Sequence, residues 1–213
     1  MTSSAEGARL GFNHNDFYHR HLLRQVPPDC GRALDIGCGT GGFARLLARR
    51  ARSVEAIDRD PEVVRAAEAL SGGVANLNFT SADLAEYQVD DGAYDFISCL
   101  ASLHHMPFVE TVTRLRAALA PGGVLAVLGC HRPATAADYL PDVVAIPTNL
   151  LANAAVRLRS RIGGDTGLVD SAPVAAPTMT IAEIRAAAAR VLPGAVIRRR
   201  LYWRHTLLYT KRS

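Results

Sequence analysis

The feature that most constrains the fold is the alternation of short apolar runs with helical stretches between residues 32 and 130. Five runs have the length and composition of buried strands, at 32–36, 53–58, 77–83, 94–100 and 124–130. Amphipathic helical patterns follow the first, second and fourth runs, at 42–51, 61–72 and 108–120. Strands that alternate with helices in this way form βαβ units, so we expect an α/β fold with a parallel sheet covered on both faces.

The last third of the chain departs from this rhythm. A helical pattern over 180–195 precedes two β-rich runs, 196–203 and 205–212, with almost nothing between them. Two strands this close must pair antiparallel, because a parallel crossover needs a dozen or more residues. Residues 131–180 fit no βα step and are interpreted as an insertion. We therefore predict one domain over 1–213 with a doubly wound, mostly parallel sheet of seven strands and a C-terminal antiparallel hairpin.

Composition places the chain among ordinary globular domains. Of its 213 residues, 49% are hydrophobic and 21% are charged, and no window approaches the ~18 unbroken apolar residues of a membrane span. The first sixteen residues lack the basic start and apolar core of a secretory signal. We expect a cytoplasmic protein with no membrane partner, and its four cysteines, none in a CxxC pair, to be reduced thiols.

Charge is distributed unevenly along the chain. The formal net charge is +4, but residues 150–213 are strongly basic and the first 149 are acidic. A basic segment can attract nucleic acid. All but one of the basic residues are arginine, Lys211 being the exception. Together with the abundance of alanine, this resembles a coding bias, so we interpret the basic segment as a solvated face and nucleic acid as a minority possibility.

A glycine-rich turn, ALDIGCGTGG at 33–42, follows the first predicted strand. Gly37, Gly39 and Gly42 fit the dinucleotide-binding pattern G-x-G-x-x-G, while a phosphate loop is excluded because no Lys-Ser or Lys-Thr follows the glycines. Asp35 lies two residues before the first glycine. A carboxylate there repels a pyrophosphate and favours a ligand with a positive group.

Two further acids follow the next two predicted strands. Asp58 closes the second strand, where a carboxylate can accept both hydroxyls of a ribose. Asp83 closes the third, where a carboxylate can accept from an exocyclic adenine amine. NAD sites also use an acid at the position of Asp58, so that residue alone does not discriminate. Taken with Asp35, however, the three acids at successive strand ends indicate a nucleoside that carries a cationic group and no phosphates.

Five segments in order resemble the successive motifs of class I S-adenosylmethionine-dependent methyltransferases of the small-molecule type. They are LDIGCGTGG, AIDRD, TSADLAEY, YDFISCLASLHHMP and LAPGGVLAVLG. The closing LPGAVIRRRLYWRHTLLYTKR is similar to the last antiparallel strand pair of that family, so the resemblance spans most of the chain. It implies a Rossmann-like sheet, an N-terminal lid helix within 1–30 and a substrate-side insertion over 131–180.

The resemblance also implies how the cofactor S-adenosylmethionine is held. The glycines let the backbone approach the methionine portion, and the first acid orients its ammonium group through water or backbone. The second acid holds the ribose, and backbone at the end of the fourth strand lines the sulfonium. The residues implied as cofactor contacts are Asp35, Gly37, Gly39, Asp58, Arg59, Asp83, Leu84, Cys99, Leu100 and Tyr18.

Catalytic candidates come from ASLHHMP, after the fourth strand. Sulfonium methyl transfer is an in-line displacement, so positioning contributes much of the rate, and a base is needed only where the acceptor must lose a proton. His104 and His105 titrate near neutrality and are the candidate bases; the alternative is that they cap the strand and pack on the next helix. We expect no metal site, because no carboxylate lies near them at ligand spacing.

The acceptor side is expected in the lid and the insertion. In the lid, Tyr18 is the first candidate for touching cofactor or acceptor, with Asn13 and His14 behind it, although this helix can equally be packed on the sheet without such contacts. The insertion is apolar and carries Tyr139, which suits a small apolar or aromatic acceptor.

The function expected is therefore methyl transfer from S-adenosylmethionine to oxygen or nitrogen, ahead of carbon, of a small molecule, by a monomer or homodimer. RNA methylation through the arginine-rich C-terminal part is an alternative, although no Asn-Pro-Pro-Tyr motif, Pro-Cys motif or RNA-binding module is present. A non-catalytic S-adenosylmethionine-binding protein is a second alternative, and a nicotinamide oxidoreductase is the residual one.

Overall fold

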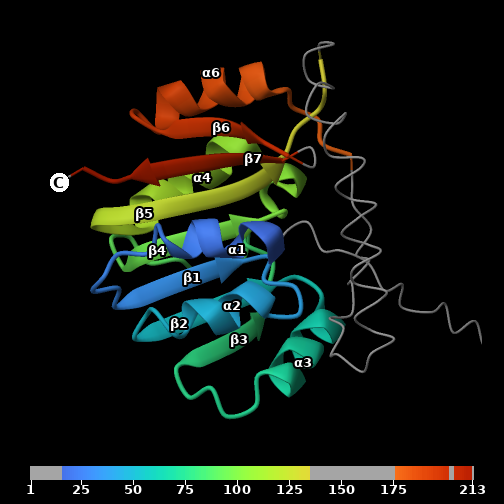
Figure 1. Ribbon diagram of the computed structural model, residues 1–213, viewed down its shortest axis with the longest axis vertical. Coiled ribbons are helices and arrows are strands. Elements are labelled where there is room, and N and C mark those ends of the chain that lie inside the picture. The colour runs from blue at the N-terminus through green and yellow to red at the C-terminus, as the bar shows by residue number, and fades with distance from the viewer. Residues whose placement is uncertain (1–15, 135–175, 202–203, 213) are drawn as a thin grey trace, which may run out of the picture.

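A seven-stranded sheet forms the centre of the computed structural model, which describes residues 16–134, 176–201 and 204–212 (Figure 1). The strands lie in the order β3-β2-β1-β4-β5-β7-β6. The first five pair in parallel, and β7 pairs antiparallel with both β5 and β6. Their bounds are β1 Arg32–Ile36, β2 Ser53–Asp58, β3 Leu77–Ser81, β4 Tyr94–Leu100, β5 Leu119–Cys130, β6 Val196–Arg200 and β7 Arg204–Thr210.

Helices cover both faces of this sheet. In Figure 1, α1 and α2 lie in front of the strands and α4 lies behind them, and α4 also packs against α6. A short 3-10 turn, η1, follows β4. The bounds are α1 Asp16–Leu23, α2 Gly42–Leu47, α3 Pro61–Leu70, η1 Leu103–His105, α4 Phe108–Ala118 and α6 Ile181–Val191.

The central strands are apolar on both faces because both faces are buried. Successive side chains of a strand point to opposite faces. In β1, Leu34 and Ile36 join the apolar cluster that includes residues of α4 and α6, whereas Ala33 joins the cluster that includes Tyr18 of α1 and Phe43 of α2. Asp35 shares the face of Ala33 by this alternation. A carboxyl group is therefore placed in a strand whose last four residues are all buried.

Local signals in the sequence fix several helix starts. The Asp60 side chain accepts from the backbone N–H groups of Glu62 and Val63, and Pro61 occupies the first turn of α3. At α6, Thr180 and Glu183 form a reciprocal capping box.

The predicted fold class is confirmed, including the C-terminal antiparallel hairpin, and three strands have the predicted bounds. The other four strands differ from the predicted bounds. β6 ends at Arg200 and not at 203, and β7 covers Arg204–Thr210 and not 205–212. The third strand ends at Ser81 and not at 83, and β5 begins at Leu119, so Pro121, Gly122 and Gly123 lie within it and do not separate it from α4. The reason is long-range pairing: the Gly122 N–H donates to the Lys211 carbonyl at 2.8 Å, and the Lys211 N–H donates to the Gly123 carbonyl at 2.9 Å.

The strand order reverses between β1 and β4. From β1 the chain proceeds outward through β2 to β3, and it then returns to the other side of β1 with β4 and β5. Ligands of open α/β sheets bind outside the carboxyl ends of the strands at such a switch point. In Figure 1 the parallel strands point to the right, so this edge lies on that side.

Candidate functional site

The turn between β1 and α2 is shaped by alternate glycines. Gly37, Gly39 and Gly41 have φ of 68°, 53° and 76°, a left-handed backbone conformation that residues other than glycine rarely adopt. A Cβ at Gly37 would lie 2.4 Å from the Cβ of Ser102. The third glycine that the turn needs in this conformation is therefore Gly41, and not the Gly42 of the dinucleotide pattern.

Hydrogen bonds hold this turn against the neighbouring strands. The N–H groups of Gly37 and Cys38 both donate to the Ile57 carbonyl, at 2.8 and 3.0 Å. On the other side, the Ser102 hydroxyl donates to the Ile36 carbonyl at 2.7 Å. The turn is thus tied to β2 and to the segment after β4, which fixes its backbone at the switch point.

Asp35 is the most unusual charged group of the site. Its side chain is 1% exposed, and its Oδ1 accepts from the Ser98 hydroxyl at 2.7 Å across the β1–β4 pair. Its Oδ2 has no hydrogen-bond partner among the described residues. Burial raises the pKa of Asp35 to about 7, against the lowering effect of the Ser98 hydrogen bond and with a contribution from the charge of Asp58. A buried carboxyl with a raised pKa, and with an oxygen that has no partner among the described residues, is a candidate binding group.

Asp58 lies at the end of β2, beside the glycine turn. Its Oδ2 accepts from the Gly39 N–H at 2.9 Å, and its Oδ1 accepts from the Asp60 N–H at 3.1 Å. A carboxylate has about four acceptor positions, so Asp58 retains capacity for two more donors. Asp83 lies two residues beyond β3 and is exposed; its Oδ1 accepts from the Ala85 N–H at 2.9 Å.

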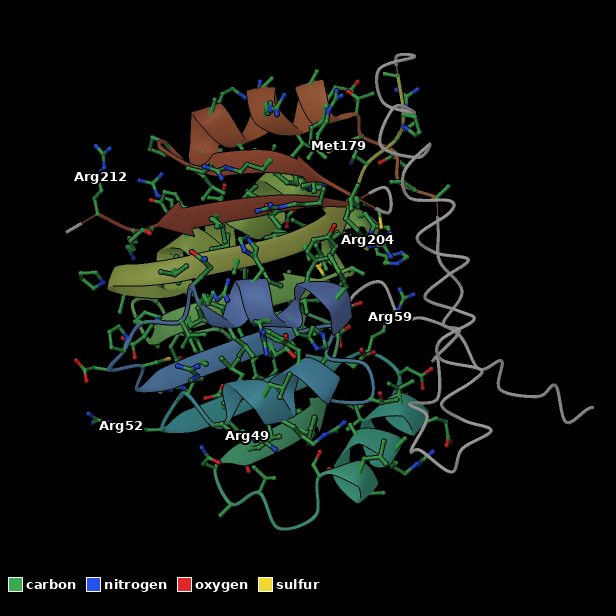
Figure 2. All side chains as sticks on the ribbon, in the orientation of Figure 1. Arg49, Arg52, Arg59, Met179, Arg204 and Arg212 are labelled. Atoms are coloured by element: carbon green, nitrogen blue, oxygen red, sulfur yellow. The ribbon has the colours of Figure 1, made fainter. Side chains whose placement is uncertain are left out.

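The other expected cofactor contacts fall on the same edge of the sheet or just behind it. Leu84 follows Asp83 and is buried. Cys99 and Leu100 end β4; the Cys99 thiol is fully buried, and burial raises its pKa to about 12. Arg59 is exposed and lies at the right-hand edge in Figure 2, where the parallel strands end.

Tyr18 lies within the apolar cluster between α1 and the sheet. It is 5% exposed, and its hydroxyl donates to the Leu201 carbonyl at 3.0 Å. This contact ties α1 to Leu201, directly after β6. That Tyr18 also contacts a cofactor stays a prediction. The predicted acceptor residues Asn13, His14 and Tyr139 lie outside the described residues.

The two predicted catalytic histidines form the end of η1. Their ring centroids are 4.0 Å apart. His105 is exposed, whereas both ring nitrogens of His104 are buried without a hydrogen-bond partner among the described residues. Burial lowers the pKa of His104 to about 4, assisted by the positive charges of His105 and Arg204. His104 is therefore neutral at pH 7 and offers one N–H donor and one lone pair.

A third histidine, which the sequence analysis did not single out, also faces this region. His205 pairs with Gly129 across β7 and β5, and it is 3% exposed. With His104 it lines a pocket of about 30 Å³ beyond the ends of β4 and β5. Figure 2 shows the neighbouring Arg204, and Met179 from the segment before α6, at this same edge. Only the pairing register, which no local pattern reveals, brings His205 here.

Ala101, directly after β4, was also missed. It is the one residue other than glycine with positive φ among the described residues, at 55°. Its N–H donates to the Leu128 carbonyl at 2.7 Å, which holds the strained conformation in place. Strain of this kind concentrates at functional sites, and here it directs the chain from β4 toward Ser102 and η1.

Within the described parts of the chain, no three His, Cys, Asp or Glu side chains come together as a metal site. Over the same residues, no helix has the length and apolar character needed to cross a bilayer. All four cysteines are free and buried.

This chain resembles known proteins in both sequence and structure. Residues 33–123 match the family described as methyltransferase domain. An uncharacterized methyltransferase of Mycobacterium tuberculosis is 32% identical over 195 residues, which cover 91% of this chain and 93% of that protein.

Two further relatives match about half of this chain. A trans-aconitate 2-methyltransferase of Variovorax paradoxus is 37% identical, over 51% of this chain and 42% of that protein. A ubiquinone biosynthesis O-methyltransferase of Xanthomonas axonopodis is 36% identical, over 49% and 45% respectively. Among solved structures, the N-methyltransferase NodS of Bradyrhizobium japonicum in complex with S-adenosylhomocysteine has a TM-score of 0.63 at 16% identity, covering 99% of this chain and 94% of that one.

Proposed function

Because this chain belongs to the class I S-adenosylmethionine-dependent methyltransferases, we propose that it methylates an oxygen or nitrogen atom of a small molecule. S-adenosylmethionine supplies a methyl group carried on a positively charged sulfur. The observation that carries the cofactor assignment is Asp35, whose buried Oδ2 has no partner among the described residues and suits a cationic ligand group.

The neighbouring residues fit the rest of such a cofactor. The positive φ of Gly37 and Gly39 keeps side chains out of the turn and leaves the backbone open to a ligand. Asp58 retains acceptor capacity for two hydroxyl groups of a ribose. Asp83 is exposed beyond β3, and we assign it the adenine amine as its donor. These contacts need no basic side chain to balance phosphate charge, in agreement with a nucleoside that lacks phosphates.

The work of the protein is then mainly to position the reactants. The backbone of Cys99 and Leu100 at the end of β4 borders the place expected for the reacting sulfur, and η1 follows it directly. His104 is neutral at pH 7, so it can accept a hydrogen bond from the molecule that receives the methyl group. Its lowered pKa makes it a weak base. Orientation of the acceptor is therefore the role that its environment favours.

Support for oxygen as the acceptor atom comes from a sequence relative that is named an O-methyltransferase. Support for a small acceptor comes from the small pocket beside η1. The test is a methyl-transfer assay with labelled S-adenosylmethionine against pooled phenols, carboxylic acids and amines. Labelled small product is expected; label that enters none of the pools, or that enters only RNA, would overturn the proposal.

RNA methylation is the second candidate, favoured by the exposed arginines Arg198 and Arg199 of the edge strand β6. It predicts RNA binding whose affinity falls steeply with salt, because phosphate contacts release counterions. Binding that is absent at 50 mM salt would eliminate this candidate.

A further inference from the structure

The connection between β3 and β4 has no helix or strand of its own. Parallel strands are normally joined through a crossover helix, but residues 82–93 form only turns and irregular backbone. Their N–H and C=O groups therefore lack the hydrogen bonds that a helix supplies, and buried backbone groups need partners from elsewhere in the fold. Asp83, the expected adenine contact, lies at the start of this connection.

Residues 83–87 form a tight turn around Asp83. The N–H groups of Glu86 and Tyr87 donate to the Asp83 carbonyl at 3.0 and 2.9 Å, and the Oδ1 of Asp83 accepts from the Ala85 N–H. These bonds all lie within the turn, so they set its internal shape. They do not fix its position relative to the sheet.

Arg114 of α4 holds the backbone of this turn from outside. Its Nη1 donates to the Leu84 carbonyl, and its Nη2 donates to the Tyr87 carbonyl. The Leu84 side chain lies in the same apolar cluster as Val112 of α4, which brings the turn and the helix together. The guanidinium group thus fastens two carbonyls of the turn to α4, which lies behind the strands in Figure 1.

Arginine suits this double contact better than lysine. A guanidinium group is planar, presents its N–H donors in a rigid fork and is not deprotonated in proteins. It can therefore donate to two carbonyls at once from one side chain. Lysine carries a single nitrogen at the end of a flexible chain, so it does not reproduce the fork.

A second contact ties the same turn to β2. The Tyr87 hydroxyl donates to Glu55 Oε2 at 2.9 Å, and Glu55 lies three residues before Asp58 in that strand. The turn with the acid expected at the adenine is therefore linked to the strand with the acid expected at the ribose. Arg114 holds the backbone of the turn, and Glu55 holds the side chain of Tyr87.

We propose that Arg114 is a positioning residue for adenine recognition: by holding the turn 83–87 against α4, it sets the Asp83 carboxylate where it accepts from the exocyclic amine. This inference rests on the proposed function, which assigns that amine to Asp83. Arg114 acts through the Leu84 and Tyr87 carbonyls and does not itself touch the cofactor. A carboxylate on a turn that is already ordered binds its donor without the cost of ordering the turn.

The consequence is selectivity for an amino group on the base. Adenine carries an N–H₂ donor at the carbon where hypoxanthine carries a carbonyl oxygen, which is an acceptor. An ionised carboxylate is also an acceptor, so a fixed Asp83 favours adenine and disfavours hypoxanthine. When the turn is free to move, the carboxylate can withdraw from the hypoxanthine oxygen, and the discrimination falls.

The first test compares S-adenosylhomocysteine with its hypoxanthine analogue, S-inosylhomocysteine, by calorimetry on the whole protein. Wild type is expected to bind S-adenosylhomocysteine at least about tenfold more tightly, the worth of one good hydrogen bond. Arg114→Met keeps a long unbranched side chain but removes both donors, and its preference is expected to fall to about threefold or less. Arg114→Lys, which keeps the charge, is expected to lie between the two.

Arg116→Met is the matched control. Arg116 is an exposed residue of the same helix, and its Nη1 also donates to a backbone carbonyl, that of Val191 in α6, at 3.1 Å. Because that contact is made to α6 and not to the turn, the control should keep the preference of wild type. A wild-type preference in Arg114→Met, or an equal fall in Arg116→Met, would overturn the proposal. Equal losses of both affinities in Arg114→Met leave the preference unchanged and would also overturn it.

Removal of Asp83 tests whether Arg114 acts through this carboxylate. Arg114→Met should change the preference in the wild-type background and not in Asp83→Ala, which has no carboxylate to position. A further change of preference in the Asp83→Ala background would contradict this route.

Hydrogen exchange of the ligand-free protein tests the contact without any cofactor. The Glu86 and Tyr87 amides donate to the Asp83 carbonyl, and they should exchange at least about tenfold faster in Arg114→Met than in wild type or Arg116→Met. Equal exchange in all three proteins would show that Arg114 does not hold the turn. If Arg114→Met does not fold, Arg114→Lys carries both tests with smaller expected changes.

The binding data keep this proposal distinct from the previous one. If wild type does not bind S-adenosylhomocysteine, the proposed function fails. If wild type binds both ligands equally, Asp83 does not receive the amine, and the present inference fails with that assignment. If wild type shows the expected preference and Arg114→Met keeps it, only the present inference fails.

Discussion

In the ligand-free protein, replacing Asp35 by Asn should affect the free energy of unfolding differently at different pH. The value for Asp35→Asn minus the value for wild type should be larger at alkaline pH than at acidic pH. Burial raises the pKa of Asp35 to about 7 in the folded chain, whereas an unfolded aspartate has a pKa of about 3.9. Between these values the folded state holds a proton that the unfolded state has released. The free energy of unfolding of wild type therefore falls as pH rises through this window and is constant above it.

The magnitude follows from the width of the window. Each pH unit corresponds to about 1.4 kcal/mol, so three units give at most about 4 kcal/mol between pH 4 and pH 7. Asn has the same shape, keeps an oxygen that the Ser98 hydroxyl can donate to, and does not titrate. Its amide N–H₂ adds a desolvation cost of about 1–3 kcal/mol that is the same at every pH.

The assay is urea unfolding of both proteins at pH 5, 6, 7 and 8. The free energy of unfolding of Asp35→Asn minus that of wild type should rise by about 2 kcal/mol from pH 5 to pH 7 and level off by pH 8. Ser98→Ala is a useful companion, because loss of its hydrogen bond raises the pKa of Asp35 further and extends the slope to higher pH. A difference that does not change with pH would refute the reasoning.

Three other substitutions test the site. Asp58→Ala leaves the Gly39 N–H without its acceptor and should weaken S-adenosylhomocysteine binding by about 1–3 kcal/mol in calorimetry; unchanged affinity would exclude Asp58 from the site. Gly37→Ala forces a Cβ against Ser102 at positive φ and should lower the free energy of unfolding by roughly 2–4 kcal/mol, measured by urea titration; a loss below 1 kcal/mol would mean that the turn adapts. Ala101→Gly relieves its positive φ and should stabilise the fold by about 1 kcal/mol, seen as a higher Tm; a lower Tm would show that Ala101 is not strained.

The parts of the fold that could be predicted are those that local sequence patterns determine. Apolar runs of five to seven residues gave β1, β2 and β4 their bounds, because parallel strands buried on both faces tolerate few polar residues. Asp35 and Asp58 could be placed at one edge of the sheet for a related reason. Carboxyl ends of successive parallel strands meet at the same edge.

The parts that could not be predicted depend on pairing between distant segments. Residues 119–123 are drawn into β5 by Lys211 of the far end of the chain, which overrides the turn signal of Pro-Gly-Gly. His205 faces His104 only because β7 pairs with β5 in a register that sets His205 opposite Gly129. The unpartnered Oδ2 of Asp35 likewise arises from packing on both sides of β1, which the residue type alone does not reveal.

The most direct test of the cofactor site is the proton released when S-adenosylhomocysteine binds. A ligand ammonium group beside Asp35 lowers the pKa of that carboxyl, which is about half protonated at pH 7 before binding. Calorimetric titrations at pH 7 in two buffers of different ionisation enthalpy measure this proton.

Wild type should bind S-adenosylhomocysteine with release of up to roughly half a proton, Asp35→Asn should bind more weakly with none, and NADH should not bind. Equal heats in the two buffers for wild type, or binding of NADH in place of S-adenosylhomocysteine, would contradict the account.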